Sequence, residues 1–165
     1  MCENMIVKYV ITLIISMIPI IELRGAIPIA VFTLHLTYIE AFILGVIGNC
    51  IPIYFIVKFI RPLFVFFGRF KFFKIIIDWA INKANKKIKE SKTLQTFTFL
   101  GLYLFVAIPL PVTGAWTGSL IANFLDLPPK KAFWPLSLGV FTAGVIILTL
   151  TAVANGGFSY LFQHM

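Results

Sequence analysis

The sequence is poor in acidic residues and in cysteine. Asp and Glu number 6 against 14 Lys and Arg, and 12% of the residues are charged, where soluble domains carry about 25%. Cys2 and Cys50 stand far apart, with no paired C-x-x-C spacing and no His cluster. We therefore expect no disulfide, no metal site and no cofactor. A chain of 165 residues also leaves no room for a soluble catalytic domain beside its apolar segments.

Apolar residues make up most of what is present. They account for 60% of the chain, which is typical of an integral membrane protein, and we expect one all-α domain over residues 1–165. The apolar stretch near the N-terminus lacks a basic leading segment and a small-x-small cleavage site. We therefore treat it as part of the fold and not as a signal peptide.

The net charge of +8 comes from one segment. Residues 58–92 hold ten Lys or Arg against Asp78 and Glu90, so the rest of the chain sums to zero. Short basic segments beside membrane spans stay in the cytoplasm, which predicts a multi-pass protein of the cell membrane with residues 61–95 cytoplasmic. Basic and apolar residues share this segment at helical spacing, which favours an amphipathic helix on anionic lipid over nucleic-acid binding.

Four apolar blocks cover residues 5–37, 39–60, 97–127 and 132–154. The second and fourth have the length of one transmembrane helix, about 20 residues. The third would measure about 46 Å as one helix, too long for a hydrocarbon core of about 30 Å and too short for two crossings. Because basic residues adjoin both of its ends, we predict a re-entrant hairpin that returns to its own side.

Proline and glycine locate the bend of this second hairpin within residues 108–118. Pro109 and Pro111 remove two amide donors and free the carbonyls one turn earlier. Gly114 and Gly118 permit a sharp turn and close helix approach. We therefore expect the helix to break here.

The first block has Pro19, Gly25 and Pro28 near its middle, so the same reasoning predicts a first hairpin over residues 5–37. Its single following span places its entry on the opposite side of the membrane. The sequence thus predicts two inverted repeats, each a re-entrant hairpin followed by a transmembrane helix. A weak sequence similarity between the two halves supports this. Gly-Ala at 25–26 is followed by Ala-Phe at 41–42, and Gly-Ala at 114–115 is followed by Ala-Phe at 132–133.

Glu22 and Arg24 are the only full charges inside the first block between Lys8 and its end. A charge near the bilayer centre costs at least about 2.5–3.5 kcal/mol, so we interpret both as functional. Two residues apart on a regular helix they would point away from each other; if Gly25 and Pro28 unwind the segment, both face one side. They could then share a ligand, a proton or a salt bridge, or form an ion pair that only pins the hairpins together.

Other candidates belong to the second hairpin. Thr113 or Thr117 could satisfy hydrogen bonds of the charged pair, and Trp116 could either stack on a substrate or pack. Gly114 and Gly118, extended by Ala115, Ser119 and Ala122, favour tight helix packing. We expect Glu40 and Asp126 to be solvated near the membrane interfaces.

ELRGAIP at residues 22–28 and AIPLPVTGAWTGSLIA at 107–122 resemble the family named putative small multidrug export proteins, over roughly residues 5–155. That family is similar in layout to the DedA superfamily, whose facing hairpins imply transport of polyprenyl phosphate or other lipids. Two features depart from these patterns. Val112 stands where members often have glycine, and no arginine lies between Phe97 and Leu127.

We expect a transporter or flippase with a midplane site at the facing hairpins, moving an anionic amphiphile such as a lipid-linked phosphate. Arg24 favours an anionic headgroup, and Glu22 is the candidate for proton coupling. The alternatives are a small multidrug exporter of cationic or lipophilic compounds, and a structural membrane protein without transport. No nucleophile with base and orienter is evident, so we do not expect an enzyme. Membrane lipids are the expected partners, and the small size of the chain is compatible with a homodimer.

Overall fold

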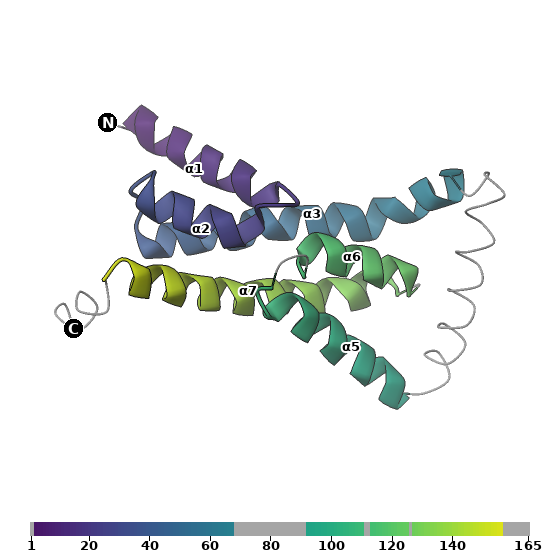
Figure 1. Cartoon of the computed structure of the whole chain (residues 1–165). Coiled ribbons are helices and arrows are strands. Elements are labelled where there is room, and N and C mark those ends of the chain that lie inside the picture. The colour runs from purple at the N-terminus through teal and green to yellow at the C-terminus, as the bar shows by residue number, and fades with distance from the viewer. Residues whose placement is uncertain (1, 68–91, 111–112, 126, 157–165) are drawn as a thin grey trace.

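The computed structural model describes residues 2–67, 92–110, 113–125 and 127–156, and every regular element in these ranges is an α-helix (Figure 1). In chain order the helices are α1 (Cys2–Met17), α2 (Glu22–Phe32), α3 (Tyr38–Phe67), α5 (Lys92–Ala107), α6 (Ala115–Phe124) and α7 (Pro129–Ala154). The predicted basic segment 61–95 lies outside the described residues, apart from the end of α3 and the start of α5. The helical class predicted from the sequence is confirmed.

Within the described ranges, two helices are long and apolar enough to cross a bilayer. They are Tyr38–Phe59 within α3 and Pro129–Ala154, and they match the spans predicted at 39–60 and 132–154. Each of them begins with a residue that favours a helix start, Thr37 just before α3 and Pro129 in α7. Pro129 occupies the first turn of α7, where its missing N–H costs nothing. These two helices therefore have the length and composition of membrane spans.

Four helices are too short to cross. With 16 and 11 residues, α1 and α2 measure about 24 and 17 Å at 1.5 Å per residue. With 16 and 10 residues, α5 and α6 measure about 24 and 15 Å. The chain breaks between each pair, at residues 18–21 and 108–114, which are the two regions where the sequence predicted a bend.

The position of the first break differs from the prediction in one respect. Gly25 and Pro28 do not unwind the chain, because both lie inside α2. The turn is made earlier, around Pro19, and the Gly25 amide already donates to the Ile21 carbonyl at 3.0 Å. Pro28 removes one intrahelical bond, to the carbonyl of Arg24, and a helix surrounded by neighbours tolerates that loss.

Each long helix packs against both short helices of its own half. Helix α3 contacts α1 and α2, and α7 contacts α5 and α6. The halves then join through α3 with α7, α3 with α6, and α2 with α7, so that the two breaks meet near the middle of the molecule (Figure 1). The core between them contains Leu23, Ile27, Ile53, Val106 and Leu136, each at most 1% exposed.

Glycines allow the closest helix approaches, and they do so at matching places in the two halves. A Cβ at Gly48 of α3 would overlap Ser16 of α1. A Cβ at Gly139 of α7 would lie 2.8 Å from the Val106 Cβ of α5 and 2.9 Å from a backbone carbonyl of the same helix. Contact with α1 in one half thus corresponds to contact with α5 in the other.

Glu40, which we expected to be solvated, is partly exposed and also forms polar bonds at the start of α3. Its carboxylate accepts from the Thr37 amide at 2.9 Å and from the Thr37 hydroxyl at 2.8 Å, while the Glu40 amide donates to that hydroxyl at 3.3 Å. This is a capping box. Tyr9 of α1 also donates to Glu40, so the cap ties α1 to α3. Asp126 lies outside the described residues.

Candidate functional site

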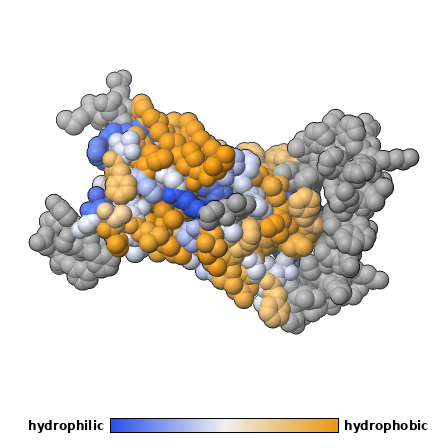
Figure 2. Space-filling view, in the orientation of Figure 1, coloured by the Kyte–Doolittle hydropathy of each residue, from blue (hydrophilic) through white to orange (hydrophobic). Residues whose placement is uncertain are grey.

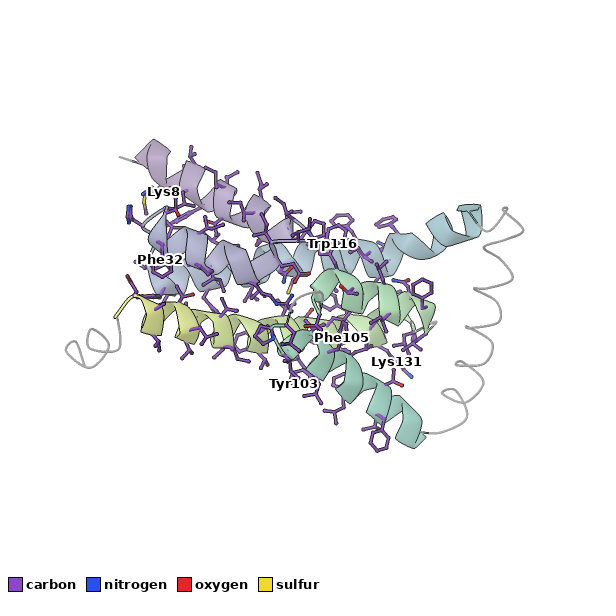
Figure 3. The ribbon with its side chains drawn as sticks, in the orientation of Figure 1. Lys8, Phe32, Tyr103, Phe105, Trp116 and Lys131 are labelled. Atoms are coloured by element: carbon purple, nitrogen blue, oxygen red, sulfur yellow. The ribbon has the colours of Figure 1, made fainter. Side chains whose placement is uncertain are left out.

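The site is the contact between the two helix breaks. We call residues 18–24 the first tip and residues 108–116 the second tip, of which Pro111 and Val112 lie outside the described residues. Figure 3 shows Trp116 and Phe105 close to where the tips meet. The tips come from parts of the chain about 90 residues apart, and the bonds between them define the geometry.

Glu22 opens α2 with a left-handed backbone, φ 49°, and is 3% exposed. This conformation is unfavourable for a residue with a Cβ, so the surrounding contacts must hold it. It also moves Glu22 off the regular helical path. Its Oε2 therefore reaches Nη1 of Arg24 at 3.1 Å, although the two residues are only two apart. The predicted pairing is present, and its cause is the turn at Glu22 and not unwinding at Gly25 and Pro28.

The Glu22 carboxylate also binds the N-terminus of α6. Its Oε1 accepts from the Trp116 amide at 3.3 Å, and the Ala115 amide is a further donor. The N-cap residue of α6 is Gly114, which has no side chain to bind these amides. Glu22 thus caps α6 from the opposite half of the molecule, where the partial positive charge of a helix start favours a carboxylate.

Gly114 makes this contact sterically possible. A Cβ at Gly114 would overlap both carboxylate oxygens of Glu22. The φ of Gly114 is −121°, which any residue can adopt, so the requirement for glycine comes from the close approach alone. Gly114, one of the glycines predicted to form a packing stripe, therefore allows the close contact between the two tips.

Arg24 binds the second tip with the other half of its guanidinium. Its Nη2 donates to the Thr113 carbonyl and lies 3.5 Å from the Thr113 hydroxyl. The Nε atom is buried and has no partner among the described residues. The Arg24 side chain is 20% exposed against 4% for Glu22, so Arg24 is the member of the pair that reaches the surface.

Thr113 orders the second tip. Its hydroxyl lies 2.8 Å from the Ile108 carbonyl and 3.0 Å from the Leu110 carbonyl, and it accepts from the Leu110 amide at 3.2 Å. One hydroxyl proton can serve only one of these carbonyls at a time. The residue predicted to supply spare hydrogen bonds therefore supplies them to its own tip, which Pro109 helps to keep out of the helical path.

Trp116 links the second tip to the end of α1. Its indole Nε1 donates to the carbonyl of Met17 at 3.1 Å, one of the carbonyls that a helix end leaves without an intrahelical partner. The sequence left open whether Trp116 stacks on a substrate or packs, and here it forms a polar bond between the halves. The Met17 carbonyl and the Ala115 amide were missed, since backbone groups carry no residue signature.

The remaining predicted site residues lie beside the junction. Gly25 and Pro28 are half-buried within α2, and Thr117 is half-buried in the first turn of α6. A Cβ at Gly118 would lie 2.8 Å from side-chain atoms of both Val106 and Leu136, so Gly118 serves helix packing. The predicted set thus separates into five residues that meet, Glu22, Arg24, Thr113, Gly114 and Trp116, and others that shape their surroundings.

One polar contact at the other end of α6 was not predicted. Asn123 of α6 is 7% exposed and its Nδ2 donates to the Ile56 carbonyl of α3 at 3.3 Å and to the Ser119 carbonyl at 2.9 Å. An amide inside an apolar block was the available signal. In the part of the chain that the structure describes, no group of three His, Cys, Asp or Glu side chains could hold a metal ion.

Comparison with known proteins identifies the family of the chain. The family model described as "Putative small multi-drug export protein" matches residues 22–146. No curated protein matches the chain, and no solved structure matches it. The matched range contains both charged residues of the first tip, the whole second tip and most of α7. Because it covers well over half of the sequence, the chain belongs to this family.

Proposed function

We propose that the chain is a membrane transporter that moves an anionic amphiphile, such as a lipid-linked phosphate, past a gate formed by the two tips. The family description supports export as the activity. The observation that carries the anionic preference is the unequal exposure of the charged pair. The Arg24 side chain is 20% exposed, although its unpaired Nε is buried, whereas Glu22 is enclosed and already bonded to Arg24 and α6.

Helix lengths support a re-entrant arrangement. Each pair of short helices turns back before it could cross a core of about 30 Å, and each is followed by one helix of spanning length. The corresponding glycine contacts of Gly48 with α1 and Gly139 with α5 fit two repeats of opposite orientation. In that arrangement the tips lie near the bilayer midplane, where side chains of the first tip bind irregular backbone of the second.

The surface supports access from the lipid. Figure 2 shows hydrophilic atoms in the middle of a face that is otherwise largely apolar, at the level where the tips meet in Figure 1. A charged group at this depth is favoured only next to polar partners. An amphiphile would place its anionic headgroup on Arg24 while its chain stays in the lipid, and a guanidinium is well suited to phosphate oxygens.

Charge balance links the substrate to a proton. Glu22 and Arg24 together are neutral, so a bound anion would leave an excess negative charge in a medium of low dielectric constant. Protonation of Glu22 removes that excess. It would also weaken the cap on α6, because a neutral carboxyl group is a poorer acceptor for the amides of Ala115 and Trp116. Headgroup binding, proton uptake and opening of the tips would therefore be coupled.

Export of cationic drugs is the second candidate, and the family description favours it. A cation would need the carboxylate of Glu22 as its partner. In the present conformation that carboxylate is 4% exposed and faces Arg24 at 3.1 Å, so the cation would meet a positive charge first. This candidate requires a conformation in which the pair has separated.

The test is uptake into liposomes, with labelled polyprenyl phosphate and a cationic dye assayed in parallel, with and without a pH gradient. We expect the anionic lipid to be transported. Arg24→Lys should slow this transport at least about tenfold, because lysine has a single nitrogen and cannot donate to Glu22 and Thr113 from two separate nitrogens. The double variant Glu22→Gln/Arg24→Gln avoids a single buried charge and should also be inactive. Lys130→Ala, which removes an exposed charge away from the tips, serves as control.

Transport of dye alone, at a rate independent of Arg24, would reverse the order of the two candidates. Unchanged activity of the double variant in a folded protein would remove the tips from the transport path. The inverted topology has its own test, since Lys92 and Lys130 should be labelled from the same side of the membrane.

A further inference from the structure

The two tips differ in how well their backbone is hydrogen-bonded. In the second tip, the Leu110 amide is paired at 2.8 Å with the Ile108 carbonyl and at 3.2 Å with the Thr113 hydroxyl, and the Thr113 carbonyl is bound by Arg24. In the first tip, the amides of Ile20 and Ile21 pair with no other described group. The first tip thus has amide donors that no described group satisfies.

Acceptors are unsatisfied at the same place. The carbonyls of Ile18 and Ile21 accept from Glu22 and Gly25, but those of Pro19 and Ile20 accept from no described group. The first tip therefore has, on adjacent residues, N–H and C=O groups that lack a partner among the described residues. A surface of this kind is self-complementary, because a second copy related by a twofold axis can offer acceptors to donors and donors to acceptors.

The side chains around these groups are apolar and exposed. Ile20 is 93% exposed, more than any other large hydrophobic side chain in the described part of the chain, and Ile18 is 37% exposed. Lipid would suit these side chains but offers no partner to the backbone. Water would suit the backbone but not an isoleucine and a proline. A protein surface satisfies both.

We propose that a second copy of the chain covers the first tip, with a twofold axis beside Ile20 and the two loops paired through their backbone. This rests on the proposed placement of the tips inside the bilayer, because only there do unpaired backbone groups require a protein partner. Glu22 and Arg24 follow the loop directly, so the second copy forms one wall of each site. The transporting unit is then a dimer.

Cross-linking tests the interface. In a background with Cys2→Ser and Cys50→Ala, Ile20→Cys is compared with Ile39→Cys, a side chain that is 71% exposed at the start of α3. In liposomes with a large excess of lipid, a short bifunctional maleimide should join Ile20→Cys into dimers at least about tenfold more efficiently, since the interface holds the two thiols together. Equal yields would overturn the proposal.

Quenching of a fluorescent label at the same cysteines separates this proposal from the proposed function. A label at position 20 shielded from both lipid-borne and aqueous quenchers supports the dimer. Quenching by lipid alone overturns the dimer and leaves the midplane site standing. Quenching by aqueous iodide overturns the bilayer placement, and with it both proposals. Subunit counting of the unmodified chain in lipid nanodiscs controls for effects of the substitutions, and a monomer there refutes the interface.

Discussion

Gly114→Ala is the sharpest test of the junction, because it adds one methyl group where the two halves touch. The added Cβ would overlap the Glu22 carboxylate, so the carboxylate would have to withdraw by roughly 1 Å or more to reach ordinary contact. The Trp116 amide already lies 3.3 Å from Oε1 of Glu22. Withdrawal therefore takes this hydrogen bond out of range and disturbs the cap on α6.

The size of the effect follows from the bonds that are lost. A hydrogen bond to a charged group contributes about 1.5–3 kcal/mol, and the loss of a helix cap costs about 1 kcal/mol. The hydrogen bond to Glu22 and the cap on α6 are partly the same interaction, so their costs do not simply add. We expect Gly114→Ala to lower the free energy of unfolding by about 2–4 kcal/mol. For a chain of this size, that corresponds to a fall in Tm of roughly 5–15 °C.

Gly101→Ala is the matched control. Gly101 is exposed inside α5, and a Cβ there would meet nothing within 4 Å. Alanine in a helix interior is more favourable than glycine by about 0.5–1 kcal/mol, so this variant should be as stable as the parent or slightly more so. Thermal unfolding of the three proteins in the same detergent gives the comparison. Equal Tm values for Gly114→Ala and Gly101→Ala would refute the close contact between Gly114 and Glu22.

Three further substitutions test separate parts of the fold by the same thermal measurement. Gly139→Ala should lower the free energy of unfolding by about 1–3 kcal/mol, because its Cβ would press on the α5 backbone; a neutral result would contradict the close packing of α5 on α7. Thr37→Ala removes the hydroxyl of the capping box and should cost about 0.5–2 kcal/mol, whereas no change would mean that Glu40 supports α3 without it. His35→Gly should raise stability by up to about 1 kcal/mol, because His35 is exposed with φ 53°, which glycine adopts without a steric penalty. A lower Tm for this last variant would show that the His35 side chain makes a stabilising contact.

Features that depend on neighbouring residues were predictable. The two spans follow from continuous apolar length, and the break before α6 follows from Pro109, whose ring excludes a regular helix. The break before α2 was predicted in the right block, and it lies at Pro19, but Gly25 and Pro28 do not take part in it. We expected Pro28 to unwind the segment. In the structure it lies inside α2, where it removes one hydrogen bond, and packing against α1, α3 and α7 offsets that loss.

The candidate site was predictable by residue type and not by geometry. Glu22 and Arg24 were identified because charges are costly in an apolar block, and Thr113 and Gly114 because they lie at the other bend. Their pairing was expected from an unwound helix. It arises from the left-handed backbone of Glu22, which no sequence pattern announces for a glutamate.

The sequence by itself determined that this is a helical membrane protein with two interrupted segments and a charged pair beside one of them. These features follow from hydrophobic length, missing amide donors and the cost of charge, all of which act within a few residues of chain. Only the tertiary structure decided that Glu22 caps α6, that Arg24 binds the Thr113 carbonyl and that Trp116 holds the end of α1. Each of these contacts joins groups 89 to 99 positions apart. Such contacts depend on how whole helices pack, and on backbone groups that every residue carries alike.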